Sequence, residues 1–101
     1  MIYEMRTYTM RPGGVPEFEE RFAERKPYRE KHSALGAFWR TEFGPLNQVI
    51  HVWPYEDLSH RDRVRDEARQ AGAWPPQGAW RQSMIKQETK VLIPAAFSPM
   101  H

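Results

Sequence analysis

Residues 35–55 read LGAFWRTEFGPLNQVIHVWPY, and this segment has the pattern of a β-hairpin. Its two halves are rich in aromatic and β-branched residues, which favour strands. Between them, Gly44-Pro45-Leu46-Asn47 has the composition of a turn. We therefore predict antiparallel strands over residues 35–43 and 48–55.

A helical pattern lies on each side of the hairpin. Val15, Phe18 and Phe22 are spaced i, i+3 and i+7 with charged residues between them, which predicts an amphipathic helix over residues 15–33. Pro27 should kink this helix, and Gly36 should end the segment. A second helix is predicted over residues 58–71, with Asp57 or Ser59 as its N-cap.

Residues 2–10 and 84–93 alternate like the hairpin strands, so the chain has the order βαββαβ. Short connections and right-handed crossovers convert this order into a ferredoxin-like α+β domain. We predict one four-stranded antiparallel sheet, with the strands in the spatial order fourth, first, third and second. Both helices should cover one face of the sheet. Residues 1–101 form a single domain in this prediction, with a core over residues 2–93 and a C-terminal arm over residues 94–101.

Alternation along the strands sorts their side chains into two faces of the sheet. We expect the helices to cover the smoother set, which is Tyr3, Met5, Thr7, Thr9, Ala37, Trp39, Thr41, Phe43, Gln48, Ile50, Val52, Ile85, Thr89, Val91 and Ile93. The second set is both charged and aromatic: Glu4, Arg6, Tyr8, Arg40, Glu42, Asn47, His51, Trp53, Tyr55, Lys86 and Glu88. We expect this second face to meet another copy of the chain about a two-fold axis; the alternative is a solvent-exposed face with weak cross-strand ion pairs.

Composition excludes several classes of function. The chain has no cysteine, which removes disulfides, thiolate zinc sites and thiol nucleophiles. Its 15 basic and 13 acidic residues are interleaved, so we expect no nucleic-acid-binding surface. No apolar run approaches the length of a membrane span, and the N-terminal residues lack a secretory pattern. We therefore expect a cytoplasmic protein that does not bind membranes.

Three segments resemble the NIPSNAP family: residues 2–13 (IYEMRTYTMRPG), residues 35–44 (LGAFWRTEFG) and residues 46–55 (LNQVIHVWPY), followed by Arg61. The resemblance implies membership of the dimeric α+β barrel superfamily, in which two ferredoxin-like protomers pack sheet to sheet. The family itself has no established reaction. Its superfamily neighbours include cofactor-independent monooxygenases, haem-degrading enzymes, isomerases and decarboxylases.

His51, Trp53 and Tyr55 share one face of a central strand, next to Arg6 and Tyr8. We predict His51 as an acid or base and Arg6 as an anion clamp, the two catalytic candidates. The predicted ligand-binding residues are Glu4, Tyr8, Trp39, Arg40, Glu42, Asn47, Trp53 and Tyr55. The alternative is that His51 is a hydrogen-bonded residue of a packed dimer.

We predict no metal site and no cofactor, because His32, His51, His60 and His101 lack ligand spacing. Haem ligation would rest on superfamily analogy alone. Two functional hypotheses follow for the homodimer. It is either a cofactor-independent oxygenase or isomerase for an aromatic or polyketide-like substrate, or a non-catalytic protein that binds a ligand or another protein.

Overall fold

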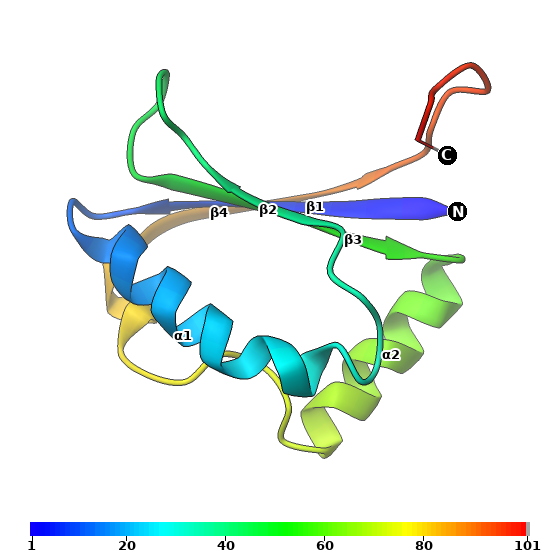
Figure 1. Cartoon of the computed structure of the whole chain (residues 1–101), viewed down its shortest axis with the longest axis horizontal. Coiled ribbons are helices and arrows are strands. Elements are labelled where there is room, and N and C mark those ends of the chain that lie inside the picture. Colours follow the sequence, from blue (N-terminus) through cyan, green and yellow to red (C-terminus); the bar gives the residue numbers. More distant parts are fainter. Residues whose placement is uncertain (101) are drawn as a thin grey trace.

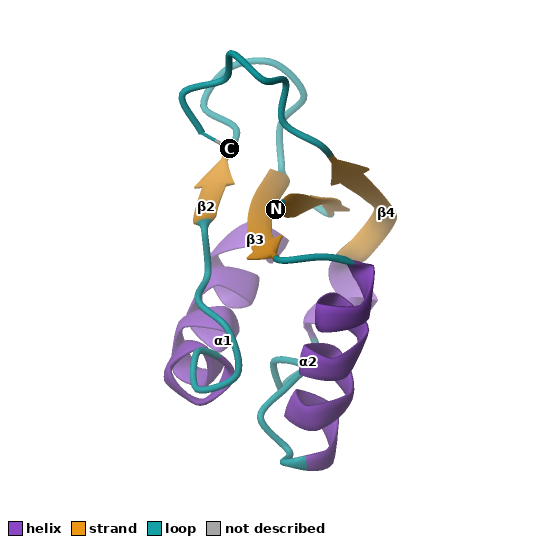
Figure 2. Cartoon of the chain, turned by 90° about the vertical axis from the view of Figure 1, so that its right-hand side faces the viewer, coloured by secondary structure: helices purple, strands orange, loops and turns teal. Residues whose placement is uncertain are grey.

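The structure is a computed structural model that describes residues 1–100. The elements follow the predicted order, with one added 3-10 helix: β1 Ile2–Met10, α1 Gly14–Arg29, β2 Ala37–Arg40, β3 Gln48–Tyr55, α2 Leu58–Gln70, η1 Trp80–Ser83 and β4 Met84–Leu92. The four strands form one antiparallel sheet in the order β2-β3-β1-β4. Both helices lie on one side of this sheet (Figures 1 and 2). The ferredoxin-like α+β fold and the strand order are thus confirmed.

The second strand and the first helix are shorter than predicted. β2 pairs with β3 only from Ala37 to Arg40, because the chain then turns away into the loop over residues 41–47. α1 ends at Arg29, two residues after Pro27, rather than at residue 33. Gly36 stands before β2 because a Cβ atom there would lie 2.9 Å from the carbonyl oxygen of Val52.

The start of α2 agrees with one of the two predicted caps. The side chain of Asp57 accepts a hydrogen bond from the backbone N–H of His60 at 2.8 Å, which satisfies a donor that the first turn leaves free. The cap fixes the direction in which α2 leaves β3. α2 then packs back under the sheet, where Val64 and Ala68 are buried.

The predicted assignment of the two sheet faces is wrong. The helices cover the face that carries Glu4, Tyr8, His51, Trp53 and Tyr55, all of which are buried. These large side chains fill the space between the sheet and α1, where they meet the rings of the helix. Sorting by polarity failed because the charged members of this set are partnered within the fold, which removes most of the cost of burying them.

The pairing of β4 with β1 shows which of their residues share a face. Glu4 lies opposite Val91 and Tyr8 opposite Gln87, in a register that is regular up to an irregularity between Thr9 and Met10. Residues directly opposite each other in an antiparallel pair share a face. Thr89 and Val91 therefore lie on the helix-covered face and Lys86 and Glu88 on the other one, as predicted for this strand, but they share those faces with the opposite β1 residues from the ones predicted. A difference of one residue in the sorting of a strand is enough for this exchange.

The opposite face of the sheet, which we call the open face, has no helix over it in residues 1–100 (Figure 1). The strand pairing places these residues on the open face: Tyr3, Met5, Thr7, Thr9, Ala37, Trp39, Gln48, Ile50, Val52, Pro54, Lys86, Glu88, Lys90 and Leu92. The loop over residues 41–47 and the C-terminal arm rise on this same side. No helix within residues 1–100 is long and apolar enough to cross a membrane.

The packing of Phe22 should carry much of the stability. Phe22 is buried among the rings of Phe18, Phe38 and Trp53, so we expect Phe22→Ala to lower the free energy of unfolding by about 3–5 kcal/mol. The control is Phe97→Ala, because Phe97 is 91% exposed and its truncation should change stability by less than about 0.5 kcal/mol. Urea denaturation of both variants checks this, and equal effects would contradict the packing described.

Candidate functional site

A cavity of about 220 Å³ lies between the sheet, α2 and the segment that joins α2 to β4. β1, β3 and β4 form its floor, α2 forms one wall, and the loop over residues 71–79 with η1 forms another. The lining residues are Arg6, Tyr8, Phe18, His51, Arg65, Arg69, Trp74, Pro75, Pro76, Trp80, Arg81, Met84 and Gln87. The cavity thus combines aromatic surface with positive charge.

His51 lines the floor of this cavity and is only 1% exposed. Its Nδ1 atom accepts a hydrogen bond from the indole N–H of Trp53 at 2.8 Å, so the ring proton of the neutral imidazole is on Nε2. Burial, reinforced by the charge of Arg6, lowers the pKa of His51 to about 3. This side chain is therefore neutral and a hydrogen-bond donor at neutral pH, and its predicted role as an acid or base stays a prediction.

The Nε2 atom of His51 is buried without a hydrogen-bond partner in residues 1–100. A buried donor without an acceptor costs about 1–3 kcal/mol. Because such groups are uncommon in folded proteins, each one calls for an explanation. Here the unpartnered N–H belongs to a residue that lines the cavity.

Arg6 is held beside His51 by a buried ion pair. The fully buried carboxylate of Glu4 contacts Arg6 at 3.0 Å and Arg61 of α2 at 3.0 Å. Burial alone would raise the pKa of Glu4, but the hydrogen bond and charge of Arg61, with the charge of Arg6, hold that pKa below its usual value. Arg6 Nε also donates to the hydroxyl of Tyr8 at 3.1 Å. These contacts fix Arg6 and Tyr8 at the cavity floor.

Aromatic rings form the walls of the cavity. The ring of Trp80 is nearly parallel to that of Tyr8, with an interplanar angle of 7° and centroids 6.2 Å apart. The indole N–H of Trp80 donates to the carbonyl oxygen of Pro76 at 2.9 Å, which anchors η1 to the preceding loop. The guanidinium of Arg81 lies 4.9 Å from the centroid of the Trp80 ring.

A second buried cation lies behind the cavity. The guanidinium carbon of Arg29 lies 4.3 Å from the ring centroid of Trp53 and 5.9 Å from that of Trp74. Arg29 also donates to the hydroxyls of Tyr55 and Ser33, each at 2.9 Å. Burial lowers the pKa of Arg29 and raises the pKa of Tyr55. This cluster joins α1 to β3 and supports Trp74, which lines the cavity.

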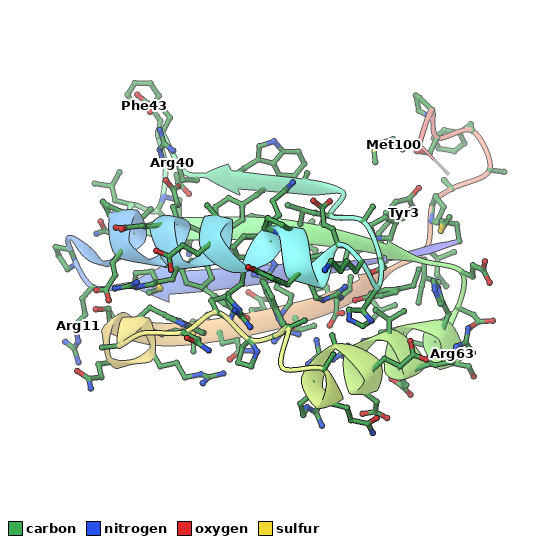
Figure 3. The ribbon with its side chains drawn as sticks, turned by 60° about the horizontal axis from the view of Figure 1, so that its bottom comes forward. Tyr3, Arg11, Arg40, Phe43, Arg63 and Met100 are labelled. Atoms are coloured by element: carbon green, nitrogen blue, oxygen red, sulfur yellow. The ribbon has the colours of Figure 1, made fainter. Side chains whose placement is uncertain are left out.

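The structure brings three of the predicted site residues together in the cavity: Arg6, Tyr8 and His51. Glu4 and Trp53 do not line the cavity but contact Arg6 and His51, respectively, and Tyr55 accepts a hydrogen bond from Arg29. The other four predicted residues lie elsewhere: Trp39 on the open face, Arg40 in an ion pair with Glu19, Glu42 in the exposed loop, and Asn47 in the turn before β3 with a φ of 60°. Figure 3 shows Arg40 close to Phe43, at the far end of the molecule from Tyr3.

The sequence prediction missed the arginines that α2 and η1 contribute, which are Arg65, Arg69 and Arg81. A signal for two of them was present in the sequence. Arg61, Arg65 and Arg69 recur at intervals of four, which places them on one side of a helix. Which side faces the sheet is settled only by the packing of Val64 and Ala68.

The NIPSNAP family model matches residues 3–99. The chain belongs to the NIPSNAP family. It is 35% identical to NipSnap homolog 1 of Danio rerio, over 98% of this chain and 36% of that protein. It is 37% identical to the NipSnap homolog of Dictyostelium discoideum, over 92% of this chain and 42% of that protein. The chain therefore spans less than half the length of these curated relatives.

Solved structures agree with this assignment. An uncharacterized NIPSNAP domain protein from Burkholderia xenovorans is 33% identical, with a TM-score of 0.86 over 98% of this chain and 99% of that one. A NIPSNAP family protein with unknown function from Agrobacterium tumefaciens is 26% identical, with a TM-score of 0.86 over 100% and 94% of the two chains. A putative antibiotic biosynthesis monooxygenase from Nitrosomonas europaea is only 9% identical, with a TM-score of 0.68 over 93% and 98%, and shares the fold alone.

The lowered pKa of His51 predicts how stability depends on pH. In the unfolded chain the histidine pKa is about 6.5, so between that pH and about 3 the unfolded state binds the proton first. The free energy of unfolding should therefore fall on acidification from pH 6.5, by up to about 1.4 kcal/mol per pH unit, and this contribution should be constant above that pH. Urea denaturation at pH 7, 6 and 5 measures the slope.

The matched variants are His51→Gln, which should flatten the slope between pH 6.5 and 5, and His32→Gln, which should retain it. His32 lies in the turn after α1 and does not line the cavity. An unchanged slope in His51→Gln would contradict a buried neutral His51.

Proposed function

We propose that the protein binds a small organic molecule in the cavity between the sheet, α2 and Trp80. The observation that carries this proposal is the unpartnered N–H of His51, which is buried at a surface lined by aromatic rings. A ligand oxygen placed there would satisfy the donor and would lie beside the guanidinium of Arg6. Concave sites with aromatic walls and a few placed polar groups are typical of small-molecule binding.

The walls favour a flat ligand. Tyr8, Trp74 and Trp80 offer ring surface, and Pro75 and Pro76 add apolar contacts. Aromatic side chains prefer stacked or edge-on contacts with other rings, so a planar aromatic group fits this lining better than a flexible aliphatic chain.

Catalysis of a reaction on such a ligand is a second candidate function, and the neutral state of His51 favours it. A neutral imidazole N–H and a guanidinium can together stabilise an enolate or phenolate oxygen. This arrangement suits cofactor-independent oxygenase or isomerase chemistry on an aromatic or polyketide-like substrate, and the fold shared with the Nitrosomonas europaea monooxygenase is compatible with it. The described lining residues include donors and cations but no carboxylate. The proposal therefore requires a substrate that is already ionised when it binds.

We propose further that the open face of the sheet is covered by a second copy of the chain. Trp39 on that face is 57% exposed, next to the half-buried Ile50. Phe43 and Leu46, in the loop that rises on the same side, are also exposed. A two-fold pairing of sheets would bury this apolar surface and would leave each cavity on the outer, helix-covered side.

Two substitutions of His51 test the ligand site. Asn places its oxygen near the position of Nδ1 and removes the Nε2 donor, whereas Gln retains an N–H donor near Nε2. With benzoate as the probe in isothermal titration calorimetry, we expect His51→Asn to weaken binding by about tenfold and His51→Gln by less than about threefold. Equal affinities for wild type and His51→Asn would contradict a ligand on this donor.

Two exposed residues on opposite sides of the molecule test the dimer. Trp39→Glu places a charge on the open face and should convert the dimer to a monomer in native mass spectrometry. Leu58→Glu is the matched control, because Leu58 is 56% exposed but lies at the start of α2. A monomeric wild type, or a dimeric Trp39→Glu variant, would overturn this interface.

A further inference from the structure

We infer that the ligand of the cavity is a small aromatic molecule with two separate negative groups, such as an aromatic dicarboxylate. One group would bind at an inner subsite formed by Arg6, Tyr8 and His51. The other would bind at an outer subsite formed by Arg65, Arg69 and Arg81. The inference rests on the proposed function, because it names the class of ligand for the same cavity.

The charge of the lining supports a ligand with more than one negative group. Four arginines line the cavity, and no Asp or Glu of residues 1–100 lines it with them. Glu4 does not line the cavity but forms ion pairs with both Arg6 and Arg61. One negative charge is therefore shared by two guanidinium groups. Guanidinium groups gathered without matching carboxylates repel one another, and a bound anion would remove that repulsion.

The outer subsite retains most of its positive charge. Arg65 is half-buried and makes no hydrogen bond or ion pair with the rest of residues 1–100. Arg81 contacts only the face of Trp80, which does not neutralise it. Arg69 approaches Asp66 at 3.8 Å, but both side chains are exposed, where such a pair contributes little. Within residues 1–100, no close ion pair neutralises Arg65 or Arg81, and a ligand carboxylate would supply one.

The inner subsite needs an acceptor of its own. The N–H of His51 is buried on the floor, whereas Arg65 and Arg69 project from α2 on the wall. An anion held by the arginines of α2 and η1 alone would leave this donor unsatisfied. Two negative groups on one rigid spacer satisfy both subsites, and the Tyr8 and Trp80 rings offer a surface for an aromatic spacer.

Isothermal titration calorimetry with three probes tests the inference: isophthalate, benzoate and inorganic phosphate. We expect isophthalate to bind about tenfold or more tightly than benzoate, because only isophthalate carries a negative group for each subsite. Arg65→Gln should weaken isophthalate by about tenfold and benzoate by less than about threefold. His51→Asn should weaken both aromatic acids.

The control variant is Arg63→Gln, which removes a charge from the same helix at an exposed position outside the cavity (Figure 3). It should leave all affinities unchanged, and thermal melting should show that every variant is folded. An Arg65→Gln effect no larger than that of Arg63→Gln would overturn the inference, because net charge alone would then explain it.

The remaining outcomes separate the two proposals. Equal affinities for benzoate and isophthalate, both weakened in His51→Asn, would overturn the two-subsite inference and leave the proposed function intact. Binding of neither aromatic acid would overturn both. Phosphate that binds as tightly as isophthalate, and depends on Arg65 but not on His51, would also overturn the inference, in favour of a simple anion site at the cavity wall.

Discussion

The arrangement of the cavity depends on the carboxylate of Glu4, which is fully buried between the guanidinium groups of Arg6 and Arg61. Burying a lone carboxylate would cost several kcal/mol, so the two arginines must remain close to it. Arg6 belongs to the central strand and Arg61 to α2. The ion pair therefore sets where α2 lies over the sheet, and with it the position of the arginines farther along that helix. Removing one partner would leave a buried charge, which is far more damaging than the loss of a surface ion pair.

Two other buried polar side chains, Arg29 and His51, differ in how fully their hydrogen bonds are satisfied. Arg29 is satisfied by Tyr55, Ser33 and the faces of two indole rings, and its role is to join elements. His51 is satisfied on one side only, by Trp53. The indole N–H of Trp53 selects the tautomer with the proton on Nε2, and burial lowers the pKa, so the ring is a neutral donor held in one orientation. The same surroundings that make His51 a poor base at neutral pH make it a well-oriented donor.

The fold was predictable because it depends on periodicity. The hairpin over residues 35–55, the helical spacing of Phe18 and Phe22 and the alternation of the outer strands give the element order, and the rules for connections between elements then predict the strand order. The choice of covered face was not predictable by polarity, because Glu4 and His51 are buried through partners that come from distant segments. The β4 grouping failed for a related reason, since alternation alone does not say which set pairs with Glu4 and Tyr8. Arg6, Tyr8 and His51 were found because they share a face of two neighbouring strands. Arg81 has no such signal, as it enters through η1.

Two arginines on one side of α2 differ in role: Arg61 forms an ion pair within the fold, whereas Arg65 forms none in residues 1–100. Arg61, Arg65 and Arg69 share a side of α2, but only Arg61 meets a buried carboxylate. Its charge is neutralised within the fold, and its pKa is raised by that contact. Arg65 has the same side chain one turn later. Its charge helps to lower the pKa of Glu4, but it makes no hydrogen bond or ion pair in residues 1–100. The carboxylate of Glu4 is already paired with Arg6 and Arg61, so the guanidinium of Arg65 keeps its hydrogen-bond donors unused at the cavity wall. The cation is therefore best explained by a negative group that the cavity receives from outside the chain.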